Sequence, residues 1–344
     1  MQKYIRDAGP HCRQAGTALA RPHFADAELR PLAELPTYLC ADSPQMSYAE
    51  RPDNERSGLH WGQMKLFLSE LRFLMDCRRP DMTIIYAGAA PGHHVPYLAS
   101  LFPSFSFRLY DPSPFCDLLS KVMDSLDSLD SNPLKKIQVH GRFFDDALAL
   151  ELQTELGALN TAFVCDIRTG KSEECVQADM AMQAGWVRRL RPARALLKFR
   201  LPWQPGVTPY LAGDILLPVY APLTSTEARL VVEQGLDGPA TKDYVNEEYE
   251  RQCAHHNVVG RARAYAHDVA ASGLDHCHDC ATLVALAEEY LRATRQPAAG
   301  RDVVQFIENT QAAFGLKRTL ATQYSASSTR AKKQFAPLAE RAAI

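Results

Sequence analysis

Three charged side chains lie inside or directly beside apolar runs of the sequence. Asp166 follows Thr161-Ala-Phe-Val-Cys165, Lys198 lies inside Leu196-Leu-Lys-Phe-Arg200, and Glu227 precedes another apolar run. Because burying an unpaired ammonium is costly, we expect Asp166 and Glu227 to be the carboxylate partners of Lys198. A buried structural ion pair would explain the same residues, so the pattern alone leaves that alternative open.

A glycine-containing turn follows the first predicted strand, in Tyr86-Ala-Gly-Ala-Ala-Pro-Gly92. Gly88 and Gly92 allow the backbone to turn sharply and to approach a ligand closely. Asp111 ends the second predicted strand, where a carboxylate can bind a ribose diol. The G-x-x-x-G spacing disfavours the pyrophosphate of a nicotinamide dehydrogenase and suits an adenosyl ligand without phosphates, such as S-adenosylmethionine. A tight turn that binds no ligand is the alternative.

Together with Lys65, the three charged residues have the chemistry that methyl transfer to a ribose 2′-hydroxyl requires. The hydroxyl is a poor nucleophile and must lose its proton as it attacks the sulfonium methyl. Lys198 could accept that proton if a neighbouring cation, Lys65, lowers its pKa. Asp166 and Glu227 would then orient the two lysines, and proximity would supply the rest. No metal is required, because the sulfonium already activates the methyl group.

The apolar patterns predict strands alternating with helices. A helix beginning near Gly62 has apolar side chains at i, i+3, i+4 and i+7, and Lys65 lies on another face of it. Strands are predicted at 83–87, 106–110, 137–140, 161–165, 195–199 and 229–233, and helices at 179–190, 282–294 and 301–314. This alternation predicts an α/β fold with a doubly wound, mostly parallel sheet, as in Rossmann-like methyltransferases, with N- and C-terminal extensions. Such sheets bind ligands at the carboxyl ends of their strands.

The predicted organisation has four parts. We expect an irregular extension over 1–55, a methyltransferase core over 56–240, a mostly helical part over 241–322 and a disordered tail over 323–344. The 38 basic and 40 acidic residues leave a formal net charge of −2, so any RNA contact must come from a local basic patch. The scattered cysteines are nine in number, which favours reduced intracellular thiols. We expect no membrane segment and an intracellular location, cytoplasmic for a viral protein and nuclear for a cellular capping enzyme.

The order of the motifs resembles a known family, the poxvirus-type cap-specific mRNA (nucleoside-2′-O-)-methyltransferases. Members of this family also serve as the small regulatory subunit of the viral poly(A) polymerase. The resemblance covers roughly residues 45 to 320. It is carried by the motifs Gly62-Gln-Met-Lys-Leu-Phe-Leu-Ser-Glu-Leu71, Tyr86-Ala-Gly-Ala-Ala-Pro-Gly92, Arg142-Phe-Phe144, Asp166-Ile-Arg168, Leu197-Lys-Phe-Arg200 and Tyr220-Ala-Pro-Leu-Thr-Ser-Thr-Glu-Ala-Arg-Leu230.

The resemblance implies a role for each matching residue. Lys65, Asp166, Lys198 and Glu227 match the family's catalytic tetrad. The family's cofactor contacts match Gln63, Tyr86, Gly88, Gly92, Asp111, Phe144 and Asp166. Asp166 thus belongs to both the tetrad and the cofactor contacts. The family stacks the N7-methylguanine of the cap between aromatic rings and reads its edge with carboxylates; Trp203, Tyr48 and Glu250 match those positions. A methylated guanine is a cation, which the face of a tryptophan binds well, although a core aromatic would explain Trp203 as well.

Two positions depart from the family's pattern. Ser113 replaces an arginine two residues after Asp111, which puts one cofactor contact in doubt. Pro205 replaces a second carboxylate that would read the cap edge, so guanine recognition is expected to differ in detail. Stimulation of a poly(A) polymerase depends on surface contacts that no motif carries, and we do not transfer it.

Several other residues have two interpretations each. Arg168, Arg200, Arg188 and Arg191 are candidate RNA contacts; the last two belong to a basic cluster that a solvated helix end would also explain. The segment His276-Cys-His-Asp-Cys280, with Cys253, His255 and His256, could supply zinc ligands, although metal-free surface residues are the commoner case. No metal is assigned.

The leading hypothesis is a cap-specific 2′-O-ribose methyltransferase that binds S-adenosylmethionine and capped mRNA, with capping or polyadenylation proteins as further candidate partners. An enzyme acting on uncapped rRNA or tRNA would keep the tetrad without needing Trp203, Tyr48 and Glu250. A non-catalytic RNA-binding processivity subunit would keep the fold as a scaffold. The lysine in the fifth predicted strand argues against a scaffold that has lost its activity, because burying a lysine costs free energy.

Overall fold

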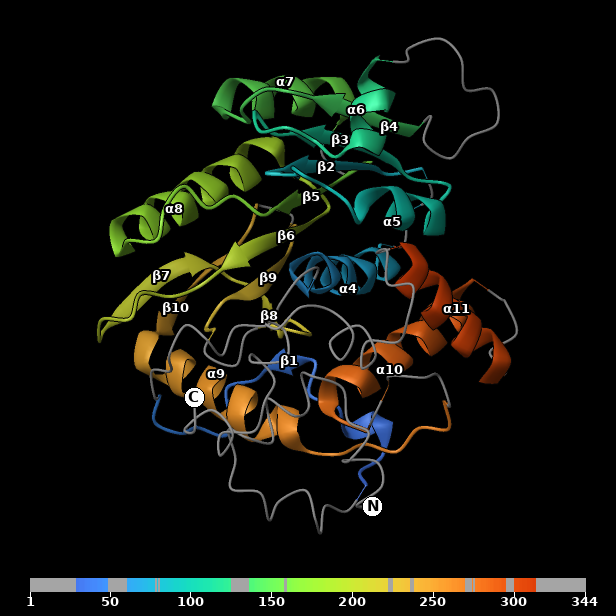
Figure 1. Cartoon of the computed structure of the whole chain (residues 1–344). Helices are drawn as coiled ribbons and strands as arrows, with labels where there is room; N and C mark the ends of the chain where they lie inside the picture. The colour runs from blue at the N-terminus through green and yellow to red at the C-terminus, as the bar shows by residue number, and fades with distance from the viewer. Residues whose placement is uncertain are drawn as a thin grey trace, which may run out of the picture. The chain divides into compact units, whose positions relative to one another are not determined.

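A computed structural model describes most of the chain (Figure 1). The described residues are 29–48, 61–77, 79, 81–124, 136–157, 160–221, 225–235, 238–269, 274, 276–294 and 300–313. The tail predicted over 323–344, and residues 1–28 and 49–55 of the predicted extension, lie outside them. Backbone contacts divide the chain into two compact units. We call Ser69–Leu217 with Glu227–Tyr249 the sheet unit, and the described parts of Met1–Leu68, Pro218–Thr226 and Glu250–Ile344 the helical unit.

A twisted sheet forms the centre of the sheet unit. Within this unit the strands follow the order β8-β9-β6-β5-β2-β3-β4. The strands are β2 (Thr83–Ala87), β3 (Ser106–Tyr110), β4 (Ile137–His140), β5 (Thr161–Cys165), β6 (Arg194–Phe199), β8 (Asp214–Leu216) and β9 (Ala228–Glu233). Neighbours from β4 to β6 are parallel, whereas β9 runs antiparallel to both β6 and β8. One reversed strand near the edge of a doubly wound sheet is the arrangement of the Rossmann-like methyltransferase fold, so the predicted fold class is confirmed.

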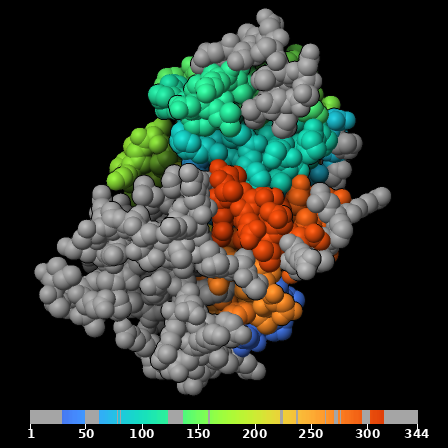
Figure 2. Space-filling model, turned by 45° about the vertical axis from the view of Figure 1, so that its right-hand side comes forward, coloured from blue at the N-terminus to red at the C-terminus, as the bar shows by residue number. Residues whose placement is uncertain are grey.

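Helices cover both faces of this sheet. They are α5 (Val95–Leu101), α6 (Asp117–Asp124), α7 (Asp146–Leu156) and α8 (Glu173–Leu190). Helices α7 and α8 pack against each other on one face, and α5 lies on the opposite face (Figure 1). The outer surfaces of α5 and α6, in blue-green, are visible in the space-filling view (Figure 2). The central strands are covered on both faces, which is why β5 is buried along its whole length and reads as a continuous apolar run.

A separate two-stranded ribbon belongs to the same unit. Strand β7 (Val207–Leu211) pairs antiparallel with β10 (Thr241–Val245). The predicted helical part, 241–322, therefore begins with a strand instead of a helix. The physical reason is local: Thr241-Lys-Asp-Tyr-Val245 has β-branched and aromatic residues, and only Tyr244 among them is buried, which suits an edge ribbon.

The helical unit contains short elements and long helices. Its elements are η1 (Leu32–Glu34), β1 (Tyr38–Leu39), most of α9 (Asn246–Val258), η5 (Gly260–Ala262), α10 (His278–Ala293) and α11 (Gly300–Ala313). Tyr290 of α10 packs on Phe306 of α11 with ring centroids 5.3 Å apart. Helix α4 (Trp61–Met75) contributes its first half to this unit and its second half to the sheet unit. Within the described part of the chain, no helix is long and apolar enough to cross a membrane.

Candidate active site

The charged residues and the glycine loop meet at the carboxyl edge of three adjacent parallel strands. In the register of β2 with β5, Ala87 is level with Cys165, and in that of β5 with β6, Cys165 is level with Leu197. The next residue on each strand is Gly88, Asp166 and Lys198, respectively. Pairing of the strands therefore brings these three residues together, although 110 positions separate the first from the last.

Gly88 makes the closest approach of the glycine loop to β5. Its φ of +77° is a conformation that side chains disfavour, and Gly92 has a φ of +67°. A Cβ at Gly88 would lie 2.8 Å from the side chain of Ile167 and 3.0 Å from its backbone nitrogen. Both glycines are therefore required by the backbone path of the loop.

Asp111 fixes the loop from the end of β3. One of its carboxylate oxygens accepts the N–H of Ala90 at 3.1 Å, and the other accepts the N–H of Ser113 at 2.8 Å. A carboxylate has about four lone-pair directions, so each oxygen can still accept a second hydrogen bond. Ser113, the position at which the family's arginine is missing, here contributes its backbone amide to the orientation of Asp111.

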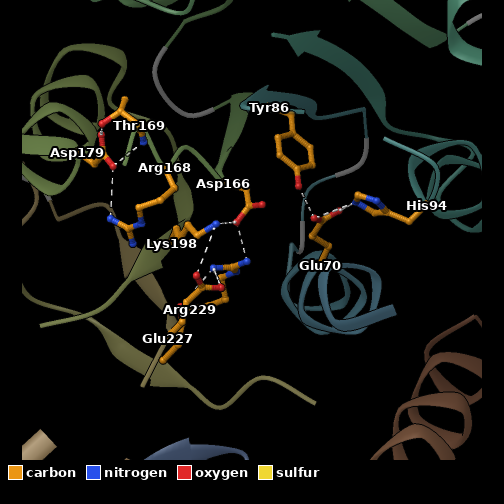
Figure 3. Close-up of polar contacts among 11 residues, drawn as sticks. Glu70, Tyr86, His94, Asp166, Arg168, Thr169, Asp179, Lys198, Glu227 and Arg229 are labelled. Carbon is orange, nitrogen blue, oxygen red and sulfur yellow. Dashed lines mark hydrogen bonds and ion pairs between the residues drawn. The ribbon is translucent and has the colours of Figure 1, made fainter. Parts of the chain in front are cut away.

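Lys198 lies between two carboxylates, as the sequence predicts (Figure 3). Its Nζ is 3.1 Å from Oδ1 of Asp166 and 3.5 Å from Oε2 of Glu227. The side chains of all three residues are largely buried, which strengthens their electrostatic interaction relative to a surface pair. The cluster joins the ends of β5 and β6 to the start of β9.

Arg229 is a fourth member of this cluster that the sequence analysis did not single out. Its guanidinium donates to Oδ1 of Asp166 at 2.7 Å and to Oε1 of Glu227 at 3.3 Å. The side chain is only 3% exposed. Burial disfavours its charge, but the two carboxylates outweigh that effect and raise the pKa of Arg229. Two signals could have revealed it: it follows Glu227 by two positions on a strand, so both side chains share one face, and the buried strand has no other basic residue.

The segment after Asp166 is held by a buried carboxylate of α8. Asp179 accepts the backbone N–H of Thr169 at 3.0 Å and its hydroxyl at 2.7 Å. Arg168 lies 3.5 Å from the same carboxylate. Arg168, a predicted RNA contact, is therefore partly buried and ion-paired at the strand end, and its role toward RNA stays a prediction.

Trp203 follows β6 and is 55% exposed. Arg200 covers one face of its ring, with the guanidinium carbon 4.8 Å from the ring centroid. Glu173 at the start of α8 pairs with Arg200 at 2.6 Å and accepts the N–H of Trp203 at 3.2 Å. Arg200, another predicted RNA contact, is thus engaged with Trp203 and Glu173. An exposed tryptophan held by its neighbours suits a stacking role better than the core role that was the alternative.

The loop after Trp203 is fixed by the first residues of α9. The side chain of Asn246 donates to the carbonyl of Gln204 at 2.9 Å and accepts from the hydroxyl of Thr208 at 2.8 Å. Glu247 accepts the N–H of Gly206 at 3.0 Å. These contacts fix the conformation of the Trp203 loop.

Phe144, a predicted cofactor contact, lies in an aromatic cluster of the core. Its ring centroid is 5.0 Å from that of Trp186, 5.4 Å from that of Phe163 and 5.5 Å from that of Tyr110. The neighbouring Phe143 is 74% exposed instead. Phe144 therefore packs against core aromatic residues, and its contact with a cofactor stays a prediction.

The predicted basic cluster lies at the end of α8. Arg188 and Arg191 are exposed, and Arg191 is the C-cap with a φ of +49°. Arg189 pairs with Asp146 at 2.9 Å, and Arg194 pairs with Glu233 at 2.5 Å. Arg188 and Arg191 remain candidates for phosphate contacts.

The remaining predicted residues belong to the helical unit. Gln63 and Lys65 lie in the first half of α4, Glu250 lies on α9, and Tyr48 lies in an irregular segment. All four side chains are partly exposed. Their roles stay predictions.

Residues 277–280 are buried and His276 is partly exposed, so the expectation of surface residues is wrong for most of this segment. Arg261 donates to both oxygens of Asp279, at 3.1 and 2.6 Å, and His278 lies 3.1 Å from the carbonyl of Pro36. These contacts explain the burial: the polar groups of the segment bind one another in the interior of the helical unit. No group of three potential metal-binding side chains occurs among the described residues.

Comparison with known proteins gives consistent results. The chain resembles the cap-specific mRNA (nucleoside-2′-O-)-methyltransferase of Myxoma virus (strain Lausanne), with 30% identity over 190 residues, 50% of this chain and 52% of that protein. It resembles the protein of the same name from Fowlpox virus (strain NVSL) with 29% identity over 186 residues, 49% of this chain and 57% of that protein. The chain thus spans about half the length of these curated relatives.

Among solved structures, bluetongue virus VP4, described as a multifunctional RNA-capping production line, aligns with a TM-score of 0.43 and 15% identity. That alignment covers 70% of this chain and 41% of VP4. The model of the poly(A) polymerase regulatory subunit family matches residues 35–294, well over half of the sequence. The chain therefore belongs to the poly(A) polymerase regulatory subunit family.

Proposed function

We propose that this protein is an S-adenosylmethionine-dependent enzyme that methylates the ribose 2′-hydroxyl of cap-proximal nucleotides in mRNA. The observation that carries the proposal is the position of Lys198. Its amine lies between Asp166 and Glu227, level with Gly88 at the edge of the sheet where ligands of doubly wound folds bind. A basic group beside a cofactor loop is what removal of a proton from a hydroxyl needs.

The residues at the glycine loop fit an adenosyl cofactor. Asp111 retains acceptor capacity for the ribose diol, because each of its oxygens accepts one hydrogen bond from the described residues. Gly88 and Gly92 hold the loop without a side chain that would obstruct the approach of a ligand. When bound, the cofactor supplies an activated methyl group.

The charged cluster would handle the proton of the 2′-hydroxyl. The amine of Lys198 accepts it while the hydroxyl oxygen bonds to the methyl carbon and the carbon–sulfur bond breaks. Asp166 and Glu227 hold the amine of Lys198 in place through the two ion pairs. Arg229 binds the same carboxylates, so they have a second cationic partner besides Lys198. Lys65 is proposed as the fourth member of this machinery.

Recognition of the cap would depend on Trp203. Its exposed ring has one face covered by Arg200, and its other face is proposed to stack on the cationic N7-methylguanine. Tyr48 is proposed as the second aromatic ring and Glu250 as the carboxylate at the guanine edge. The names of the Myxoma and Fowlpox relatives support a capped substrate. Because that substrate occurs inside cells, we propose an intracellular location.

A second candidate function is regulation of a poly(A) polymerase. The description of the family, as a regulatory subunit of that polymerase, favours it. This role would require binding to another protein and would not need Lys198. The two functions are compatible in one chain, and they are separated by testing Lys198 variants in both methyl transfer and polyadenylation.

Transfer of labelled methyl from S-adenosylmethionine tests the proposal. The substrates are one short RNA with an N7-methylguanosine cap and the same RNA without it. Wild type is compared with Lys198→Met and with Lys136→Ala, which removes an exposed lysine of the same unit. We expect label on the capped RNA with wild type and Lys136→Ala, and a loss of at least about 100-fold with Lys198→Met.

Each other outcome has a definite meaning. Equal label on both RNAs would replace the cap-specific enzyme by one that acts on uncapped RNA. Absence of label with wild type, while RNA is still bound, would favour the non-catalytic subunit. Full activity of Lys198→Met would exclude Lys198 as the proton acceptor.

A further inference from the structure

A buried polar cluster joins the two ends of the glycine loop to α4. The hydroxyl of Tyr86, on β2 two residues before Gly88, donates to Oε1 of Glu70 at 2.7 Å. Nε2 of His94, two residues after Gly92, lies 2.9 and 3.1 Å from the two oxygens of the same carboxylate. One carboxylate therefore holds the residues that flank the loop on either side (Figure 3).

The cluster is closed to solvent. The relative exposure is 1% for Glu70, 2% for Tyr86 and 1% for His94. A buried carboxylate without hydrogen-bond donors is strongly destabilising, and here Tyr86 and His94 are the donors. Burial, reinforced by the charge of Glu70, also raises the pKa of Tyr86 well above its ordinary value, so its hydroxyl keeps the proton that it donates.

The position of the cluster distinguishes it from an ordinary core contact. Between Tyr86 and His94 the chain has left-handed backbone at Gly88 and Gly92, and a further side-chain tie of the loop is the bond from Ala90 to Asp111. Asp111 therefore fixes the middle of the loop, while Glu70 fixes both ends. Removal of either tie to Glu70 takes away a buried side-chain contact at one end of the loop.

We infer that Glu70, Tyr86 and His94 are positioning residues that set the conformation of the cofactor loop, and through it the affinity for the adenosyl cofactor. This inference rests on the proposed function for the identity of the ligand. The three side chains act through the backbone of Gly88–Gly92 and take no part in proton transfer. His94 is informative because it is not among the cofactor contacts that the family resemblance implies.

Two conservative variants test the inference, each against a matched control. Tyr86→Phe keeps the ring and removes the hydroxyl, and His94→Phe keeps an aromatic ring and removes the hydrogen-bond donor. Tyr210→Phe is the control, because it removes another buried tyrosine hydroxyl in the same unit, one that donates to the carbonyl of Met180 at 3.0 Å. All are compared with wild type for binding of S-adenosylhomocysteine by calorimetry and for amide exchange of the loop in the ligand-free protein.

We expect Tyr86→Phe and His94→Phe to raise the Kd for S-adenosylhomocysteine about tenfold and to speed exchange of the amides of residues 87–93. Tyr210→Phe should leave the Kd and the exchange of the loop amides unchanged, even if it lowers the unfolding temperature as much as the two cluster variants do. If the loop amides and the Kd of the two cluster variants match those of the control, the cluster is merely structural and the inference is wrong.

The two readouts also separate this inference from the proposed function. Faster loop exchange in both cluster variants, with no binding of S-adenosylhomocysteine by wild type, would support the role in positioning the loop and contradict the proposed cofactor. If wild type binds S-adenosylhomocysteine and both variants keep the exchange and the Kd of wild type, the proposed cofactor is supported and the role in positioning the loop is contradicted.

Discussion

Lys198 and Arg229 are direct cross-strand partners in the antiparallel pair of β6 with β9. Two cations at such positions repel each other, and the carboxylates of Asp166 and Glu227 lie against both of them. Each carboxylate is therefore shared by a lysine and an arginine, which offsets the repulsion between the two cations.

Arg229 is predicted to be essential for both activity and stability. Arg229→Met removes one of the two cations that bind the largely buried carboxylates of Asp166 and Glu227. Breaking a buried ion pair from one side costs about 3–5 kcal/mol, so the free energy of unfolding should fall by about that amount. Arg229→Lys keeps the charge but not the two-pronged geometry and should lose activity with a smaller loss of stability. Methyl transfer and urea unfolding measure the two effects; a fully active Arg229→Met protein would contradict the account.

Gly88 is predicted to tolerate no side chain. Gly88→Ala places a methyl group 2.8 Å from the Ile167 side chain at a φ of +77°, which should cost about 1–3 kcal/mol of stability and weaken binding of S-adenosylhomocysteine. Gly141→Ala is the control, because a Cβ there meets nothing within 4 Å. Calorimetry and thermal unfolding of both variants check the prediction, which fails if Gly88→Ala binds as well as Gly141→Ala does.

Trp203 is predicted to determine the preference for capped RNA. Trp203→Ala should raise the KM for capped RNA by about tenfold or more, because loss of a central stacking residue typically costs at least about 2 kcal/mol. Activity on uncapped RNA and the unfolding temperature should change little, since the ring is exposed. Val207→Ala removes another exposed apolar side chain nearby in sequence and serves as the control. An unchanged ratio of capped to uncapped activity in Trp203→Ala would remove Trp203 from cap recognition.

His256 is predicted to make the stability depend on pH. Burial, followed by repulsion from His278 and Arg261, lowers the pKa of His256 well below its ordinary value. The unfolded chain binds a proton near pH 6.5 that the folded protein does not bind, so the stability is complete above this pH and falls as the pH decreases below it, by up to about 1.4 kcal/mol per pH unit.

Urea unfolding of wild type and His256→Gln at pH 7.5, 6.5 and 5.5 tests this sign. The loss of stability on acidification should be smaller in the variant, whatever its stability at pH 7.5. Equal losses in the two proteins would show that His256 does not stay neutral in the folded state.

Much of the central sheet could be predicted from the sequence because buried parallel strands are short apolar runs bounded by turn residues. The bounds of β2, β3, β4 and β5 agree with the prediction, whereas α8 begins six residues earlier than expected. Its N-cap is Ser172, whose hydroxyl accepts the N–H of Cys175 at 3.3 Å, and two glutamates follow. This capping signal lies in a polar stretch without apolar periodicity.

The edge elements were harder to predict. Strand β7 contains Pro209, which weakens a strand pattern, and β10 has a single buried side chain. In the candidate site, the pairing of Lys198 with Asp166 and Glu227 followed from the cost of burying an ammonium. The spacing of Arg229 from Glu227 is visible in the sequence, but its position opposite Lys198 depends on the register of β6 with β9, which a sequence does not display.

The position of the transferred methyl group is the most direct test of the central claim. Capped RNA methylated by the wild-type protein is digested with a nuclease that cannot cleave beside a 2′-O-methyl ribose, and the products are identified by mass spectrometry. We predict a nuclease-resistant cap fragment that carries one additional methyl group on a ribose, and none with Lys198→Met. A methyl group on a base, or on riboses remote from the cap, would contradict the account.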